Sequence, residues 1–506
     1  MDSRRLVLAA VCLWAATAAA GAAGTTADHA AARPAIRAAD ARVRQAVALM
    51  QKDQLDAARV LLDAAIHAAP GGAAAWSKRA ELDILQDRID DAIADASHVL
   101  ELHADQDVQA DAYLTRETAW GKKGEDARML ADMDRGTTIA PARADFLERR
   151  ALWAIDHGRW DLASAAASRA LGINLQCATC RAERAFARAR LGEREAALAD
   201  AKSAVARAPG DSMVRRLYGD TLAALGDHRR AIEEFDKALA IDPGNSGTRF
   251  DRGDSYQSLR DLASAIADYS DVLEHGHYSD PGAVLLSRGV AFYRANDLPR
   301  AIADLHRAVE MHPADPIAAD VLGRALEDSG DTTGAVEAYG QAATHETDGR
   351  SAGPLGRLEM FAGHFAQALE PLRAMVRGGG PRSSTYGPLW LYQSRLRADA
   401  ADQDAARAEL ARLAPPHEPR VWTDELTEFM LDRIDAATLQ QRAQGGPQDK
   451  QIGRHCEADY YVAEIELAHG HRDAALPLLD EAVRICPSNF DEAHGAQAEL
   501  RRQAQP

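Results

Sequence analysis

The stretch LYGDTLAALGDHRRAIEEFDKALAIDP, residues Leu217 to Pro243, decides the fold of this chain. Gly226 stands where the backbone has to turn between two helices, because glycine tolerates a left-handed conformation. Ala231 is a small residue of the second helix, Phe235 follows one turn later, and Pro243 ends that helix. The stretch therefore predicts two helices joined by a tight turn.

The same unit recurs along most of the chain. Ala163, Ala197, Ala231 and Ala265 lie 34 residues apart, and most other steps are 33 to 38 residues. Such a period is typical of helix–turn–helix units that stack into a solenoid, in which each unit packs on its neighbours. An anchor of this kind marks each predicted second helix: Ala58, Ala92, Met129, Ala163, Ala197, Ala231, Ala265, Ala301, Ala335, Ala368, Ala406 and Ala475.

The spacing of the clearest unit resembles a tetratricopeptide repeat (TPR), in its residues Gly219, Gly226, Ala231, Phe235, Ala238 and Pro243. The resemblance implies an all-α fold, a right-handed TPR superhelix (an α-solenoid) of about twelve helix–turn–helix repeats with a C-terminal capping helix. It also implies a long concave groove for partners rather than a single catalytic pocket.

Glycine and proline mark the ends of the predicted helices. Proline ends a second helix and starts the connection to the next unit. These closing prolines are Pro70, Pro141, Pro209, Pro243, Pro313 and Pro487. The turns between the two helices of a unit are expected at Gly158, Gly192, Gly226, Gly330, Gly363 and Gly470.

Composition and charge restrict the packing and the partners. Alanine is abundant and aromatic residues make up only 5% of the chain, so we expect tight helix packing mediated by alanine. The formal net charge is −18 at pH 7, which argues against nucleic acid or anionic lipid as the main partner.

The N-terminus has the pattern of a secretory signal. Arg4 and Arg5 precede an apolar run from Leu6 to Ala19, and small residues follow. We expect cleavage of residues 1–22 and a periplasmic or secreted protein without stable membrane insertion; a retained anchor is the alternative. Lipidation at Cys12 is disfavoured because Cys12 lies too early in the apolar run.

Four further segments are expected after the signal. Residues 23–39 form a flexible lead, 40–377 a TPR solenoid of about ten repeats, and 378–388 a hinge rich in glycine and proline. Residues 389–506 form a C-terminal TPR module with a helical insertion and a capping helix. Residues 386–500 are similar to the closing module of exported bacterial TPR proteins of the NlpI type, which implies a role among envelope proteins.

Four cysteines remain after cleavage of the signal. An even number in an exported chain favours disulfides. Cys456 and Cys486 lie at ends of two antiparallel helices that should meet, so we expect a bridge between them, with buried free thiols as the alternative. Cys177 and Cys180 form a CATC motif, for which we expect a local disulfide; a redox centre, half of a metal site and free thiols are the alternatives.

The sequence indicates no enzyme. The GxSxG, HExxH and GxxxxGK[ST] patterns are absent, so the common hydrolase, zincin and phosphate-loop signatures are missing. Histidine pairs fall in predicted turns and lack the further ligands that a metal needs. We therefore expect no catalytic residues, no metal and no cofactor.

Ligands of TPR proteins bind to the inner face of the first helices. In register with the repeat, that face carries candidate peptide-binding residues of mixed charge and aromatic character. These residues are Arg216, Asp220, Phe250, Asp254, Tyr293, Arg324 and Arg357. Asp220 and Asp254 occupy positions where the carboxylate clamp of chaperone-binding TPRs has asparagine, which argues against that activity.

A second candidate surface is basic. Arg181, Arg184, Arg188 and Arg190 follow one another at helical spacing within a single first helix. The sequence therefore predicts an exported scaffold or adaptor that binds proteins or peptides, in cell-envelope assembly, through its concave groove. The alternative is a carrier of an anionic glycan or polymer, which would use the four arginines.

Overall fold

A computed structural model describes residues 28–504 apart from 277, 347, 348, 379–384, 400–402, 419, 446, 488 and 489. The regular elements of these residues are 27 α-helices, with no strand among them. The predicted signal segment, residues 1–22, lies outside the described residues, and so does most of the predicted hinge. Helix α2 begins at Asp28, so residues 28–39 of the predicted flexible lead are helical.

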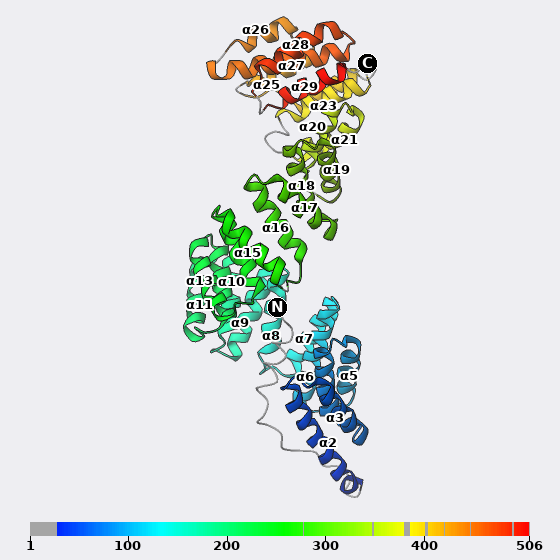
Figure 1. The fold of residues 1–506 in the computed structure, drawn as a ribbon, viewed down its shortest axis with the longest axis vertical. Coiled ribbons are helices and arrows are strands. Elements are labelled where there is room, and N and C mark those ends of the chain that lie inside the picture. The colour runs from blue at the N-terminus through cyan, green and yellow to red at the C-terminus, as the bar shows by residue number, and fades with distance from the viewer. Residues whose placement is uncertain are drawn as a thin grey trace. The chain divides into compact units, whose positions relative to one another are not determined.

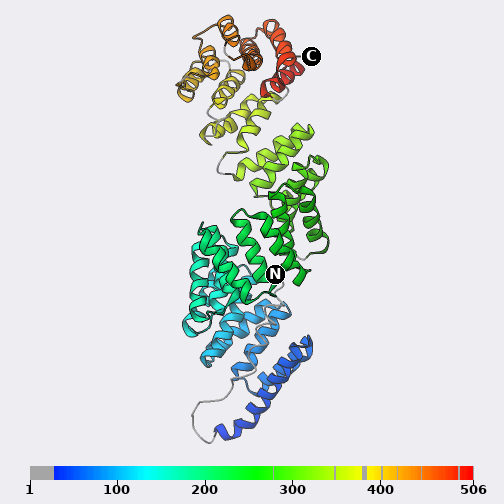
Figure 2. The ribbon, with the colours of Figure 1, turned by 90° about the vertical axis from the view of Figure 1, so that its left-hand side faces the viewer.

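Ten helix pairs follow one another in chain order (Figures 1 and 2). In every pair the second helix contains the anchor residue that the sequence indicated, alanine in nine pairs and Met129 in α7, and each of these residues is buried. The pairs are α2 (Asp28–Met50) and α3 (Leu55–Ala68), α4 (Ala73–Leu85) and α5 (Ile89–Glu101), α6 (Gln106–Lys122) and α7 (Asp126–Ile139), α8 (Asp145–Asp156) and α9 (Trp160–Ile173), α10 (Ala178–Arg190) and α11 (Arg194–Arg207), α12 (Ser212–Ala224) and α13 (His228–Ile241), α14 (Ser246–Ser258) and α15 (Leu262–His275), α16 (Pro281–Arg294) and α17 (Leu298–Met311), α18 (Pro316–Ser329) and α19 (Thr332–His345), and α20 (Ala352–Ala362) and α21 (Phe365–Gly378).

The C-terminal module continues with seven helices. Between α24 and α27 the chain inserts two short helices at the place where the sequence indicated an insertion, and the predicted capping helix after Pro487 is α29. The helices are α23 (Gly387–Ala398), α24 (Gln403–Leu413), α25 (Trp422–Met430), α26 (Ala436–Ala443), α27 (Gln448–Ala468), α28 (Arg472–Ile485) and α29 (Asp491–Gln503).

The turns inside the pairs confirm the positions expected for glycine. All six glycines named above have a positive φ, for example 79° at Gly226 and 88° at Gly330. Proline follows the second helix as predicted, since α13 ends at Ile241 and Pro243 lies two residues later.

The two helices of a pair approach closely over small residues. A Cβ atom added at Gly219 would lie 2.5 Å from the ring of Phe235, which is itself 1% exposed. The same arrangement joins Gly253 to Tyr269 and Gly323 to Tyr339. Helices with a side chain at these glycines would have to separate, so the tight packing expected from the composition depends on them.

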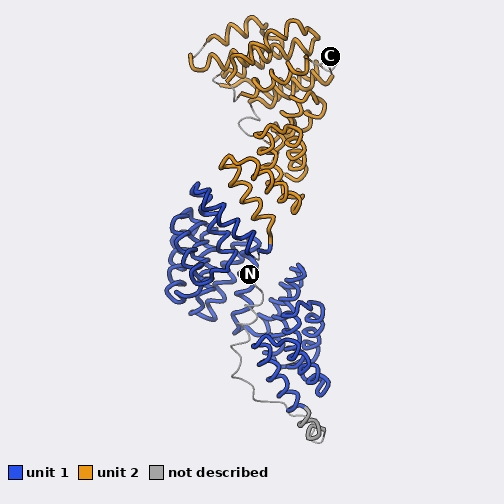
Figure 3. The backbone as a smooth tube through the Cα atoms, viewed as in Figure 1, with its two compact units in different colours: residues 1–279 blue, residues 280–506 orange. Residues whose placement is uncertain are grey.

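The chain divides into two compact units, Met1–Ser279 and Asp280–Pro506 (Figure 3). In unit 1 small clusters of buried alanine, leucine and aromatic residues join consecutive helices. In unit 2 one continuous core extends from Met360 to Ala496 and includes Trp390, Tyr460 and Tyr461. Within the described residues, no helix has both the length and the apolar character that crossing a bilayer requires.

Candidate functional site

Arg216 on α12 is the centre of a cluster of carboxylates in unit 1. Its Nε atom lies 2.9 Å from Asp251 Oδ2 on α14 and 3.6 Å from Asp220 Oδ2 on α12. Burial raises the pKa of Asp220 well above its ordinary value, the charge of Asp251 adds to this, and Arg216 opposes both. Burial likewise raises the pKa of Asp251 against the effect of Arg216. Two carboxyl groups thus share one guanidinium group.

Aromatic side chains of α14 and α15 lie next to this cluster. Tyr269 donates a hydrogen bond of 2.6 Å to Asp254 Oδ1, and burial raises the pKa of Asp254 to about 6 against the effect of that bond. The ring of Phe250 lies 5.6 Å from the ring of Tyr269 and 5.1 Å from that of Tyr278, measured between centroids. Arg216, Asp220, Phe250, Asp251 and Asp254 together form what we call the acidic–aromatic surface.

The charge of Arg216 also acts on a third carboxyl group, from an earlier repeat. Burial raises the pKa of Asp156, at the end of α8, and the charge of Arg216 is the largest effect that opposes the rise. This arginine of α12 therefore interacts electrostatically with side chains of both α8 and α14. Such convergence of first helices is what a curved stack of helix pairs produces.

Sequence reasoning identified four members of the acidic–aromatic surface and missed Asp251. The signal was present, because Asp251 lies three residues before Asp254 on the same helix, and residues at that spacing are neighbours on a helix surface.

The other three predicted residues lie in unit 2, mostly engaged with neighbouring side chains. Tyr293 donates a hydrogen bond of 2.8 Å to Asp328, and Arg324 pairs with Asp320 at 2.7 Å while remaining 45% exposed. Arg357 is only 12% exposed and pairs with Glu327 on α18 and, at 3.4 Å, with Asp491 on α29. Arg357 therefore links three helices of unit 2.

The four arginines of the predicted basic patch lie on α10, where Asp200 of α11 attracts most of them. Arg184 makes two bonds of 2.8 Å to Asp200, and Arg188 makes one of 2.6 Å to the same carboxylate. Arg181 lies 3.7 Å from Asp200, and the guanidinium of Arg190 stands 4.7 Å above the ring of Trp160. The patch thus offers less free positive charge than its sequence suggests.

The pair formed by Arg184 and Asp200 belongs to a recurring pattern that sequence reasoning did not use. An arginine of a first helix binds an aspartate of the second helix sixteen positions later, with two nitrogen–oxygen distances of 2.6–2.9 Å in each case. The five pairs are Arg79–Asp95, Arg116–Asp132, Arg184–Asp200, Arg252–Asp268 and Arg288–Asp304. In each pair the aspartate lies three residues after the anchor of its helix and sixteen after the arginine, so both members recur with the repeat.

Both expected disulfides are present. Cys456 lies inside α27 and not, as expected, at its end, and its bond to Cys486 joins α27 to the end of α28. The two Cα atoms are 5.0 Å apart, and the bond closes a loop with a sequence separation of 30. Cys177 and Cys180 are bonded at the start of α10, with a sequence separation of 3. In the chain-entropy model the longer loop contributes about 4 kcal/mol and the shorter about 2 kcal/mol.

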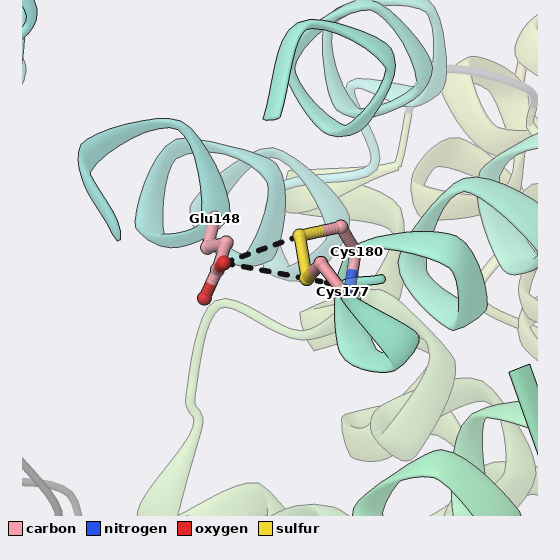
Figure 4. A group of neighbouring side chains, drawn as sticks. All are labelled: Glu148, Cys177 and Cys180. Carbon is pink, nitrogen blue, oxygen red and sulfur yellow. Dashed lines mark hydrogen bonds between the residues drawn. A yellow bond between two sulfur atoms is a disulfide. The ribbon is translucent and has the colours of Figure 1, made fainter. Parts of the chain in front are cut away.

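The carboxyl group of Glu148 lies against the shorter disulfide (Figure 4). Its Oε1 atom is 3.3 Å from Cys177 Sγ and 3.2 Å from Cys180 Sγ. Neither sulfur of a disulfide carries a hydrogen, so the carboxyl group has to be the donor. Burial raises the pKa of Glu148, and the charge of Asp145 adds to this, which favours the protonated form.

Comparison with known proteins identifies the repeat. The family model described as tetratricopeptide repeat matches residues 183–246, 250–316 and 286–351. No curated protein matches the chain.

The solved structures to which the chain is similar include a thermophilic TPR protein of Thermus thermophilus, PilF of Pseudomonas aeruginosa and human IFIT1. The first is 22% identical with a TM-score of 0.33, over 37% of this chain and 100% of that one. PilF is 16% identical with a TM-score of 0.37, over 41% and 96% of the two chains. IFIT1, solved as a dimer with PPP-AAAA, is 14% identical with a TM-score of 0.42, over 80% and 88%.

Proposed function

We propose that this TPR α-solenoid is an exported adaptor that binds an extended, basic segment of a partner protein on its acidic–aromatic surface. TPR domains act in general as scaffolds for protein interactions, and no enzyme family matches the chain. We propose the class of partner and the compartment in addition to this general role.

The observation that carries the proposal is the excess of carboxyl groups around one guanidinium group. Asp251 and Asp220 lie 2.9 and 3.6 Å from Arg216 Nε, and the charge of Arg216 also acts on Asp156, so one positive charge serves three carboxyl groups. A lysine or arginine of a partner would supply the missing positive charge and form charge-assisted hydrogen bonds with the carboxylates. Charge complementarity of this kind selects a basic segment and rejects an acidic one.

The aromatic part of the surface supplies the contact area. Phe250 packs between Tyr269 and Tyr278, so its ring is held in place before a partner arrives. A rigid aromatic side chain loses little conformational entropy on binding, which is why such residues dominate binding energies. We therefore expect an apolar residue of the partner beside the basic one.

The proposed compartment is the periplasm or the outside of the cell, and the proposed setting is the assembly of the cell envelope. The signal-like N-terminus and the two disulfides support export, because disulfides persist in oxidising compartments. Cell fractionation and N-terminal sequencing of the mature chain test this part; a cytoplasmic chain that keeps its N-terminus would contradict it.

The alternative function, a carrier of an anionic glycan or polymer, would use the arginines of α10. Two of its four arginines are bonded to Asp200. The acidic–aromatic surface is for this reason the better supported site.

Fluorescence anisotropy tests the binding proposal. A short labelled peptide of lysine, arginine and leucine should bind the mature chain, and a peptide with glutamate in place of the basic residues should not. Phe250→Ala and Asp251→Asn should each weaken binding about tenfold or more, because each removes part of a desolvated contact. Asp236→Asn is the matched control, since Asp236 lies exposed on α13 and pairs with Arg252.

Circular dichroism of each variant separates a loss of binding from a loss of fold. Equal binding of the basic and the acidic peptide, or full binding by a folded Phe250→Ala variant, would refute the site. Binding of the acidic peptide alone, abolished by Arg181→Ala and Arg190→Ala together, would favour the glycan carrier.

A further inference from the structure

The start of α10 brings two cysteines together with two glutamates, of which Glu183 is fully buried. Glu148 reaches both sulfurs from α8. Glu183 follows Cys180 by three residues on α10, is 0% exposed, and has no hydrogen-bond partner for either carboxyl oxygen among the described residues. Burial raises the pKa of Glu183 well above its ordinary value, and the charge of Glu148 is the next contribution, so the two carboxyl groups are neighbours.

We propose that Cys177 and Cys180 form a thiol–disulfide exchange site, in which Cys177 is the attacked sulfur and Glu148 carries the proton of Cys180. The substrate class is a dithiol or disulfide on a polypeptide or a small thiol compound. This activity is independent of the proposed peptide binding, and it departs from the expectation that the pair is only structural and that the chain is not an enzyme.

A structural role explains the position of this disulfide poorly. Cys177 is the N-terminal cap of α10 and Cys180 belongs to its first turn, so the bond joins two points of the same helix. The bond between Cys456 and Cys486 joins α27 to α28 and holds two helices together. The first bond therefore places no constraint between elements, whereas the second does.

The geometry around Cys177 suits an attacking or attacked sulfur. Cys177 Sγ accepts a hydrogen bond of 3.0 Å from the backbone N–H of Cys180, and the helix N-terminus stabilises negative charge at that place. Cys177 is partly buried and Cys180 is 0% exposed, so Cys177 is the more exposed of the two residues. A stabilised, more exposed first cysteine and a buried second one are the two parts that exchange needs.

Glu148 is placed to move the proton that the exchange requires. Its Oε1 atom lies within hydrogen-bonding distance of both sulfurs (Figure 4). Among the described residues, this is the only group of three or more His, Cys, Asp or Glu side chains whose polar atoms converge in this way. Glu183, which has no hydrogen-bond partner among the described residues, lies near Glu148. The surroundings of the disulfide are therefore uncharged only while the carboxyl groups of both glutamates are protonated.

The proposed reaction conserves atoms and electrons. A substrate thiolate attacks Cys177 Sγ, the bond to Cys180 Sγ breaks, and Cys180 leaves with the electron pair and takes the proton of Glu148. A mixed disulfide now joins the substrate to Cys177. The second substrate thiol loses its proton to Glu148 and attacks the substrate sulfur of the mixed disulfide, which releases Cys177 as a thiolate. Two electrons have passed from the substrate dithiol to the protein disulfide, and a disulfide substrate reverses the sequence.

The decisive experiment compares the two disulfides within the same full-length chain. Dithiothreitol is added at neutral pH, thiols are alkylated at intervals, and mass spectrometry follows each pair. The pair Cys456–Cys486 is the matched control, because it too has one buried and one partly buried cysteine. We expect Cys177–Cys180 to open at least about tenfold faster than Cys456–Cys486, because proton transfer by a positioned side chain usually contributes even more than this. Glu148→Gln should remove most of the difference in rate.

A trapping variant identifies the attacked sulfur. Cys180→Ser, treated with oxidised glutathione, should accumulate a mixed disulfide on Cys177, whereas Cys177→Ser should accumulate little on Cys180. Circular dichroism checks that each variant keeps its helices, and Glu148→Asp provides a second variant should Glu148→Gln not fold.

Three results would overturn the proposal. The two disulfides could open at equal rates, or a folded Glu148→Gln variant could open as fast as the wild type. Zinc alone, added to the reduced chain in the presence of a chromophoric chelator, could be bound in stoichiometric amount by a pair that does not exchange, which would make the cluster a metal site.

Discussion

Arg260 occupies the turn between α14 and α15 with a φ of 64°, in the left-handed region. The corresponding turn of the preceding pair has Gly226, with a φ of 79°. All ten pairs from α2 to α21 have one such residue at this place, and where glycine is missing an aspartate, asparagine or arginine adopts the same conformation. The stacking of the pairs therefore imposes the turn even on side chains that disfavour it.

Replacing Arg260 with glycine should stabilise the protein by about 0.5–1 kcal/mol. Glycine adopts the left-handed conformation without steric cost, and this gain exceeds the larger conformational entropy that glycine loses on folding. Gly226→Ala should lose about 1 kcal/mol, since a Cβ there meets no atom within 4 Å and only the backbone conformation matters. Urea unfolding followed by far-UV circular dichroism measures both. Equal shifts in the same direction would show that the turns are not strained.

Gly253 illustrates the second residue-scale requirement, close approach between the helices of a pair. A Cβ at this position would lie 2.7 Å from Cε1 of Tyr269, a ring that is fully buried. Gly253→Ala should therefore destabilise the protein by roughly 1–3 kcal/mol through overpacking. The melting curve is the measurement.

Gly340→Ala is the matched control for Gly253→Ala. Gly340 also lies inside a helix, α19, but a Cβ there has no neighbour within 4 Å. The substitution should stabilise by up to about 1 kcal/mol through helix propensity. A loss of stability in both variants would mean that the close packing of Gly253 is not the cause.

At the scale of the helix, each arginine–aspartate pair connects two different helices, which contacts between residues close in sequence cannot do. Arg252 on α14 binds Asp268 on α15 through two nitrogens and binds Asp236 on α13 through a third. Asp268 is 7% exposed and Arg252 about one fifth exposed. One planar side chain thus holds its own second helix and that of the preceding pair.

Arg252→Met should destabilise the protein by about 2–3 kcal/mol, because it leaves a buried carboxylate without its cation. The double variant Arg252→Met/Asp268→Leu should recover much of this loss, since an apolar pair needs no compensation. Unfolding free energies of the two variants and of Asp268→Leu complete a double-mutant cycle. A double variant no more stable than Arg252→Met would contradict the assigned role.

At the scale of the whole molecule, unit 2 buries hydrogen-bonded carboxyl groups inside its core. In unit 2 the carboxyl group of Glu457 accepts hydrogen bonds from Tyr386 at 3.2 Å and Trp422 at 2.8 Å, and Tyr461 donates one of 3.1 Å to Glu492. These contacts connect α23, α25, α27 and α29 through the buried carboxyl groups of Glu457 and Glu492.

These glutamates should make the folded protein less stable as the pH rises. Burial raises the pKa of Glu457 to about 7, and burial together with the charge of Glu457 raises that of Glu492 to about 8, whereas the ordinary value is 4.5. The folded state therefore binds more protons than the unfolded state between pH 4.5 and 8, and the free energy of unfolding falls over that range.

Urea unfolding at a series of pH values checks this. Glu457→Gln together with Glu492→Gln should flatten the dependence above pH 4.5, the ordinary carboxyl value. Glu481→Gln, on the exposed surface of α28, should leave it unchanged. A free energy of unfolding that rises with pH in the wild type would contradict the raised pKa values.

Sequence alone determined the repeat and the positions at which its helices end and turn. The anchors, the left-handed glycines, the closing prolines, the insertion and the capping helix all follow from local propensity and a fixed period, because each pair of helices is built from residues close in sequence. The predicted hinge, residues 378–388, mostly lies outside the described residues and stays a prediction.

Only the tertiary structure decided which side chains share a site. Asp251 joins Arg216, and Glu148 reaches cysteines about thirty residues away, because the angle at which helices cross sets these contacts and sequence spacing does not. For the same reason the arginines of α10 looked like a free basic patch in sequence, whereas Asp200, on the facing helix, binds two of them. Local sequence preferences therefore determined the helices, and the packing of the helices determined which of their side chains interact.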